Sequence, residues 1–142
     1  MVRKVIAAQA LLKASGTVTG KLLRWLAESG HIDEGAADDA SARAREAARD
    51  LPIADRLRTL LHDVTDHAPA IDPDEVADAD WVEDYREITD VEPGKIWFEG
   101  GVGPIAVPRK ASDLARPGWS AFVTAAKIGA TWHLLEVGVV YP

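Results

Sequence analysis

Residues 81–142 read WVEDYREITDVEPGKIWFEGGVGPIAVPRKASDLARPGWSAFVTAAKIGATWHLLEVGVVYP. This stretch holds four of the chain's five tryptophans, both tyrosines and both phenylalanines. Its short apolar runs are separated by Pro-Gly, Gly-Gly and Ile-Gly breaks. Aromatic and β-branched residues favour strands, whereas glycine and proline mark turns. The composition therefore predicts a small, tightly turned β domain at this end of the chain.

Five strands are expected in this region, at about residues 85–91, 95–99, 105–107, 119–128 and 131–141. Pro93-Gly94 suits a type II turn, and Gly129-Ala130 suits the tip of a hairpin between the last two strands. Residues 108–116 read as a connector with one helical turn. The pattern predicts a small, half-open antiparallel barrel of the SH3-like or OB-like kind.

The rest of the chain predicts four or five helices, which gives an α+β protein divided into residues 1–80 and 81–142. The first two helices, at residues 2–14 and 20–29, are separated by Ser15-Gly16 and form a helix-turn-helix-like hairpin. Further helices are expected at 42–49, at 52–67 where Pro52 suits the first helical position, and after Asp72. The expected core comprises Leu11, Leu22, Leu26, Leu57, Leu60, Leu61, Ile96, Val107, Val123, Leu135 and Val137.

Charge is distributed unevenly along the 142 residues, whose net charge is −7. Residues 1–27 carry five basic and no acidic side chains, and residues 28–92 carry six basic and twenty acidic ones. The absence of cysteine excludes disulfides, thiolate nucleophiles and cysteine metal sites. No apolar run approaches the roughly 20 residues of a membrane span, and the N-terminal apolar stretch is too interrupted for a signal peptide. We therefore expect a cytoplasmic protein that does not contact a membrane.

Catalytic and metal-binding patterns are weak. Residues 62–67, HDVTDH, place histidine and aspartate at helical spacing, but a specific metal site usually needs further ligands. Ser120 and His133 could face each other across the final hairpin, an arrangement more typical of a surface pair. Residues 100–103, GGVG, lack the lysine and Ser/Thr of a phosphate-binding loop. The sequence predicts no catalytic residue, metal or cofactor, and a small enzyme with a His/Asp site remains an alternative.

Aromatic side chains in the barrel are the favoured binding residues. Neighbours on a strand point to opposite faces, so one ring of Trp97-Phe98 should lie outside the barrel core. Such rings need a cover, either the chain's own helices or a partner, and aromatic anchors dominate protein interfaces. The favoured function is a non-enzymatic accessory or adaptor protein that binds another protein, or itself, through Trp97, Trp119, Trp132 and Tyr141.

A DNA-binding regulator is the alternative suggested by the basic N-terminus. In a helix-turn-helix pair the second helix contacts DNA through its first residues, and cationic side chains contact phosphates. Residues 1–30 could present Thr17, Thr19, Lys21 and Arg24 in this way. The strongly acidic segment that follows would repel nucleic acid.

Overall fold

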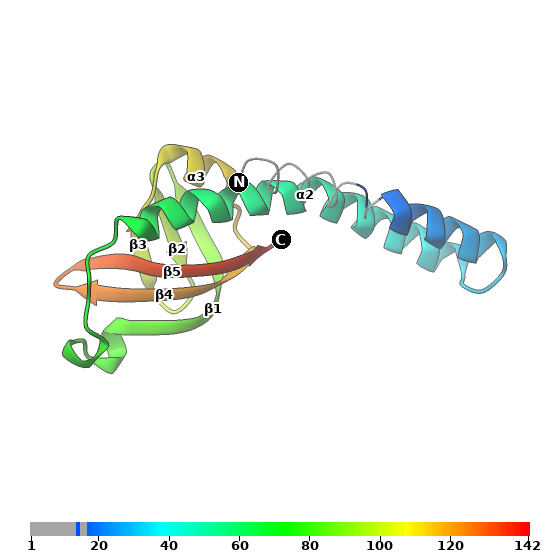
Figure 1. Cartoon of the computed structure of the whole chain (residues 1–142). Coiled ribbons are helices and arrows are strands. Elements are labelled where there is room, and N and C mark those ends of the chain that lie inside the picture. Colours follow the sequence, from blue (N-terminus) through cyan, green and yellow to red (C-terminus); the bar gives the residue numbers. More distant parts are fainter. Residues whose placement is uncertain (1–13, 15–16) are drawn as a thin grey trace. The chain divides into compact units, whose positions relative to one another are not determined.

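The computed structural model describes Ala14 and residues 17–142, and it contains a closed five-stranded β-barrel together with α-helices (Figure 1). Two compact units divide between Ile53 and Ala54, inside the long helix α2 (Glu34–Asp66). The barrel and the second half of α2 belong to the unit Ala54–Pro142. Within the described residues, no helix combines the length and the apolar character needed to cross a membrane.

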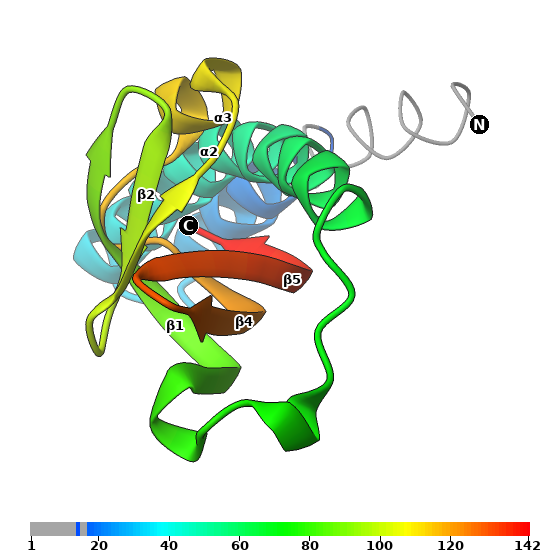
Figure 2. The same cartoon turned by 90° about the vertical axis from the view of Figure 1, so that its left-hand side faces the viewer.

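The barrel strands are β1 (Trp81–Glu92), β2 (Lys95–Phe98), β3 (Val102–Ala106), β4 (Ser120–Ile128) and β5 (Thr131–Tyr141). Around the closed barrel, hydrogen-bonded neighbours follow the order β1-β2-β3-β5-β4 (Figures 1 and 2). Neighbouring strands are antiparallel except β3 and β5, which are parallel. The expectation of a half-open, wholly antiparallel barrel is therefore wrong. A closed ring of five strands cannot alternate direction at every step, so closure forces one parallel pair.

Turns and one short helix hold the strand ends together. Gly94 in the Pro93-Gly94 turn has a φ of 80°, which glycine adopts without steric strain. The hairpin tip at Gly129-Ala130 is confirmed. In α3 (Arg109–Leu114), the buried Ser112 hydroxyl accepts a hydrogen bond from the Gly94 N–H at 2.9 Å. The same hydroxyl donates to the Arg109 carbonyl at 2.8 Å, so α3 is tied to the β1–β2 turn.

About half of the residues expected in the core are buried. Ala54, Leu57 and Leu61 form a buried stripe on the second half of α2, which runs along the barrel in Figures 1 and 2. Leu22 was wrongly expected in the core, since it is 52% exposed. Leu11 lies outside the described residues. The expected core residues that are buried are Leu57, Leu61, Ile96, Val107, Val123 and Val137, and those that are half-buried are Leu26, Leu60 and Leu135.

The expectation of four or five helices is also wrong. Among the described residues there are three α-helices, at 17–28, α2 and α3, because the two helices expected at 42–49 and 52–67 are continuous. Pro52 lies inside α2, although an interior proline typically costs about 3 kcal/mol. The strong helix formers on either side and the burial of Leu57 and Leu61 compensate for that cost.

Two short 3₁₀ turns, η1 (Pro73–Glu75) and η2 (Asp78–Asp80), replace the helix expected after Asp72. The expected cap is present, because the Asp72 carboxylate accepts a hydrogen bond from the Asp74 N–H at 3.0 Å. At the N-terminal side, Thr17 and Thr19 lie within helical residues 17–28 and not ahead of them as caps. The first helix of the expected helix-turn-helix pair lies outside the described residues, apart from Ala14, which is helical.

Candidate binding surface on the barrel

One face of the barrel is formed by alternate residues of β1, β4 and β5 that point away from the core. Their neighbours along the strands, such as Val82, Val123 and Val137, are buried inside the barrel. We call this surface the β1–β4–β5 outer face. Strand pairing places on it Trp81, Glu83, Tyr85 and Glu87 of β1, then Ala126, Thr124, Phe122 and Ser120 of β4, and His133, Glu136, Gly138, Val139 and Tyr141 of β5.

Three rings from the three strands meet on this face, and we call Tyr85, Phe122 and Tyr141 the aromatic cluster. The centroids of the Tyr85 and Phe122 rings are 5.5 Å apart in an edge-to-face arrangement. Those of the Tyr85 and Tyr141 rings are 6.4 Å apart. Tyr85 is 56% exposed and Tyr141 is 46% exposed. The cluster is therefore held by ring contacts and remains open to solvent.

A β-bulge in β5 shapes the surface next to Phe122. Ala121 pairs with Val140 and Val123 pairs with Val137, so two residues of β5, Gly138 and Val139, lie opposite Phe122. A Cβ at position 138 would lie 3.1 Å from the Phe122 Cβ, which explains why glycine suits this position. Val139 is exposed beside it. The bulge thus extends the aromatic cluster into a shallow apolar surface.

An acidic row adjoins the aromatic cluster. Glu83 and Glu136 are the cross-strand neighbours of Thr124 on its two sides, and both are exposed. Thr124 itself is only 6% exposed, and its hydroxyl oxygen is buried without a hydrogen-bond partner among Ala14 and residues 17–142. With Glu87, the outer face carries three glutamates and no lysine or arginine. None of the three forms an ion pair with any residue in the described part of the chain.

The predicted binding residues occupy different environments. Tyr141 belongs to the aromatic cluster, whereas Trp119 and Trp132 are buried, at 6% and 9% exposure. Trp97 is half-buried, and its ring covers Gly103, where an added Cβ would lie 2.8 Å from Trp97 Cδ1. Phe98 is buried, so one ring of the Trp97-Phe98 pair does lie in the core.

Two members of the aromatic cluster, Tyr85 and Phe122, were not among the predicted binding residues. Sequence alternation could have placed each ring on one face of its own strand. It could not show that these faces coincide, because that depends on the Tyr85–Phe122 pairing between β1 and β4.

The helical residues predicted to contact DNA are all exposed. Arg24 lines a cavity of about 360 Å³ within the N-terminal unit, where acidic side chains outnumber basic ones. Its lining comprises Arg24, Ala27, Glu28, Glu34, Ala37, Asp38, Ser41 and Arg45. The exposed predicted residues on helix 17–28 are Thr17, Thr19, Lys21 and Arg24. The same helix also exposes an apolar stripe of Val18, Leu22 and Trp25 at helical spacing.

Within the described residues, no histidine side chain forms a hydrogen bond or ion pair with an aspartate side chain. His67 Nδ1 lies 2.7 Å from the Asp63 backbone carbonyl oxygen, not from its carboxylate. The expected Ser120–His133 pair is wrong, because Ser120 pairs with Tyr141 and His133 pairs with Ala126. Six residues of β4 separate the two positions, or about 20 Å. Among the described residues, no group of three or more His, Asp or Glu side chains is placed to hold a metal ion.

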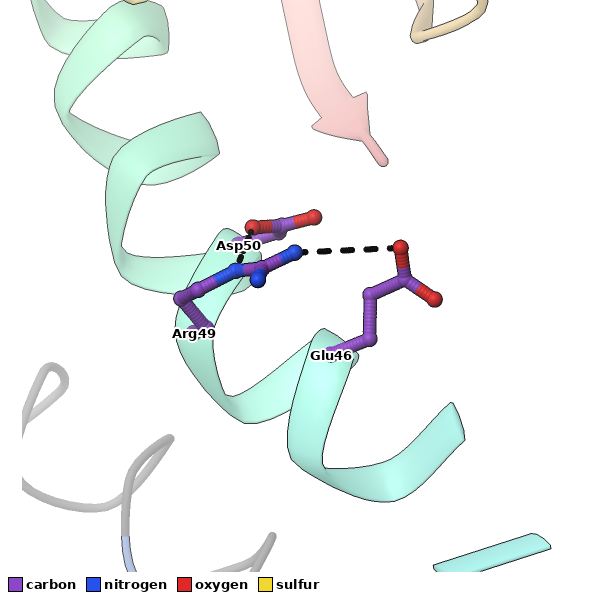
Figure 3. A network of polar contacts seen from close by, with 3 residues as sticks. All are labelled: Glu46, Arg49 and Asp50. Atoms are coloured by element: carbon purple, nitrogen blue, oxygen red, sulfur yellow. Dashed lines mark hydrogen bonds and ion pairs between the residues drawn. The ribbon is translucent and has the colours of Figure 1, made fainter. Parts of the chain in front are cut away.

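A polar network within α2 accounts for one buried carboxylate (Figure 3). Arg49 Nε donates to Asp50 Oδ1 at 2.9 Å, and an Arg49 terminal nitrogen lies 3.7 Å from Glu46 Oε1. The hydrogen bond and charge of Asp50, and to a smaller extent the charge of Glu46, raise the pKa of Arg49. Asp50 thus uses its carboxylate to pair with Arg49 within a continuous helix.

A cavity of about 490 Å³ lies at the hairpin end of the outer face. It is lined by Pro69, Ala70, Ile71, Asp72, Glu75, Val76, Ile128 and His133. Among these lining residues, His133 also lies on the β1–β4–β5 outer face, where it pairs with Ala126.

No protein-family model, curated protein or solved structure matches this chain.

Proposed function

We propose that this protein is a non-enzymatic adaptor that binds another protein through the β1–β4–β5 outer face. The observation that carries the proposal is the aromatic cluster, in which rings from three strands meet while Tyr85 and Tyr141 stay about half exposed. Covering the exposed parts of both tyrosines would bury roughly 200 Å² and contribute about 5 kcal/mol before the costs of association. Rings in such positions are typical anchors of protein interfaces.

We further infer that the barrel is of the OB type. Two features support this: the closed order with parallel β3 and β5, and the position of α3 between β3 and β4. OB folds that bind oligonucleotides use the β2–β3 surface and the loops β1–β2 and β4–β5. Here both connections are two-residue turns, and the exposed charges nearby are mostly acidic, with Asp90, Glu92 and Glu99 against Lys95. These features favour a protein partner over a nucleic acid.

The test removes both exposed rings. The full chain, the Tyr85→Ser/Tyr141→Ser variant and an Ile128→Ser control are expressed with a tag in the organism that encodes them. Ile128 is an exposed apolar residue outside the aromatic cluster. Co-purifying proteins are quantified by mass spectrometry, and self-association is followed by sedimentation.

We expect recovery of a specific protein, or self-association, to fall at least about tenfold in the double variant, since each 1.4 kcal/mol is a factor of ten. The Ile128→Ser control should behave as the unmodified chain. Identical protein recovery and identical sedimentation for all three chains would contradict the proposal.

A further inference from the structure

We propose that the β1–β4–β5 outer face receives an arginine side chain from a basic segment of its protein partner. The guanidinium would lie over Thr124, between Glu83 and Glu136 and beside the aromatic cluster. The inference rests on the proposed function and adds the chemistry of the segment that is bound.

The Thr124 hydroxyl is the first support, because a buried polar group is rarely left without a partner. Val123 and Ala125 face the core, so Thr124 points to the outer face. Its oxygen makes no hydrogen bond with any of the residues that the structure describes. Glu83 and Glu136 beside it are exposed, and exposed side chains change rotamer within nanoseconds. We infer that rearrangement of these two side chains opens a path from the outer face to the hydroxyl.

Charge is the second, independent support. Direct cross-strand neighbours have Cβ atoms about 5 Å apart, so Glu83 and Glu136 stand about 10 Å apart with Thr124 between them. Neither carboxylate forms an ion pair with the described residues. A single cation placed between them would interact with both. It would meet no competing lysine or arginine on this face.

The aromatic cluster distinguishes arginine from other cations. The Tyr85–Phe122 row follows the Glu83–Thr124 row two residues along the strands, or about 7 Å away. A planar guanidinium can stack on a ring while its five N–H donors reach two carboxylates and a hydroxyl. A lysine ammonium offers three donors around one point and no plane to stack. The three rows from Glu83 to Glu87 span about 13 Å, which suits an extended segment of about four residues.

The probe is a fluorescein-labelled peptide, Arg-Gly-Arg-Gly-Arg, measured with the full chain by fluorescence anisotropy at low and at high salt. Two further peptides are measured in parallel, one with lysine and one with citrulline in place of arginine. Citrulline is the uncharged isostere of arginine. The test variant is Glu83→Gln/Glu136→Gln. The matched control, Glu28→Gln/Glu92→Gln, changes the net charge equally at two exposed positions that are not on the outer face. Threonine-methyl NMR locates the peptide.

We expect the arginine peptide to bind more tightly than the lysine peptide and the citrulline peptide to bind at least about tenfold more weakly. Glu83→Gln/Glu136→Gln should lower the affinity for the arginine peptide about tenfold, because it removes two surface ion pairs at the upper end of their usual strength. The control variant should lower this affinity by less than about twofold. Thr124→Val should lower it about threefold. The Thr124 methyl resonance should shift on titration, while the exposed Thr89 methyl should not.

Equal losses in the two glutamine variants, equal binding of the citrulline peptide, or no binding of the arginine peptide would overturn the inference. The proposed function would survive any of these results if Tyr85→Ser/Tyr141→Ser still lost the partner, since the face would then bind a segment without arginine. If that double variant also retained its partner, both proposals would fail.

Discussion

Replacing Thr124 with valine should make the protein more stable. Thr124 is 6% exposed, and its hydroxyl oxygen is buried with no hydrogen-bond partner in the described part of the chain. Valine has nearly the same shape and is also β-branched, so it keeps the strand preference and leaves no cavity. The substitution removes only the cost of burying an unpaired hydroxyl.

That cost is about 1–3 kcal/mol for a fully buried group. We take the lower end, because Thr124 lies on the outer face beside exposed glutamates. The free energy of unfolding should rise by about 1 kcal/mol, which corresponds to about 3 °C in Tm for a chain of this size. Thr89→Val is the matched control. Its hydroxyl is on an exposed residue of β1, so the change should stay within about 0.5 kcal/mol.

Urea unfolding followed by tryptophan fluorescence measures both variants, since the buried Trp119 and Trp132 report on the barrel. A Thr124→Val variant that is less stable than the unmodified chain would contradict this prediction, because the hydroxyl would then have a partner in the folded protein. A variant that is more stable but binds the arginine peptide more weakly would show that the unpaired hydroxyl serves binding at a cost to stability.

Three further substitutions and one control test the fold. Leu57→Ala should lower the free energy of unfolding by about 3 kcal/mol because Leu57 is fully buried. The control Leu22→Ala should change it by less than about 0.5 kcal/mol, and urea titration measures both variants. Gly103→Ala should lower the free energy of unfolding by about 3 kcal/mol and alter Trp97 fluorescence. The φ of Gly103 is 140°, and the new Cβ would lie 3.0 Å from the Trp97 Cα. Ser112→Ala should lower the free energy of unfolding by about 1 kcal/mol, because it removes the hydrogen bonds that tie α3 to the β1–β2 turn. Calorimetry measures this change, and an unchanged Tm would contradict that role.

Proline shows where local signals in the sequence are ambiguous. Pro93 and Pro73 mark a turn and the start of a short helix, as expected from the residues beside them. Pro52 carries the same signal for a helix start, yet it lies inside α2. The difference comes from burial of Leu57 and Leu61 against the rest of their unit, and a window of neighbouring residues does not contain that information.

The candidate binding surface was only partly predictable for a similar reason. Exposure of Tyr141 and burial of Phe98 follow from position and alternation along a strand. Trp119 and Trp132 look like interface anchors in the sequence, but the closed barrel buries them. Tyr85 became part of the surface through its pairing with Phe122. The burial of the two tryptophans and the placement of Tyr85 depend on strand pairing between residues far apart in the chain.

Local sequence patterns predict the α+β class, most of the β4–β5 hairpin and the β1–β2 turn, because alternation, glycine and proline act over a few residues. The tertiary structure alone establishes closure of the barrel, the parallel β3–β5 pair and the bulge opposite Phe122. These features set which side chains share a face. They are fixed by hydrogen bonding between distant strands, and a one-residue change in register would move Tyr85 to the opposite face of its strand.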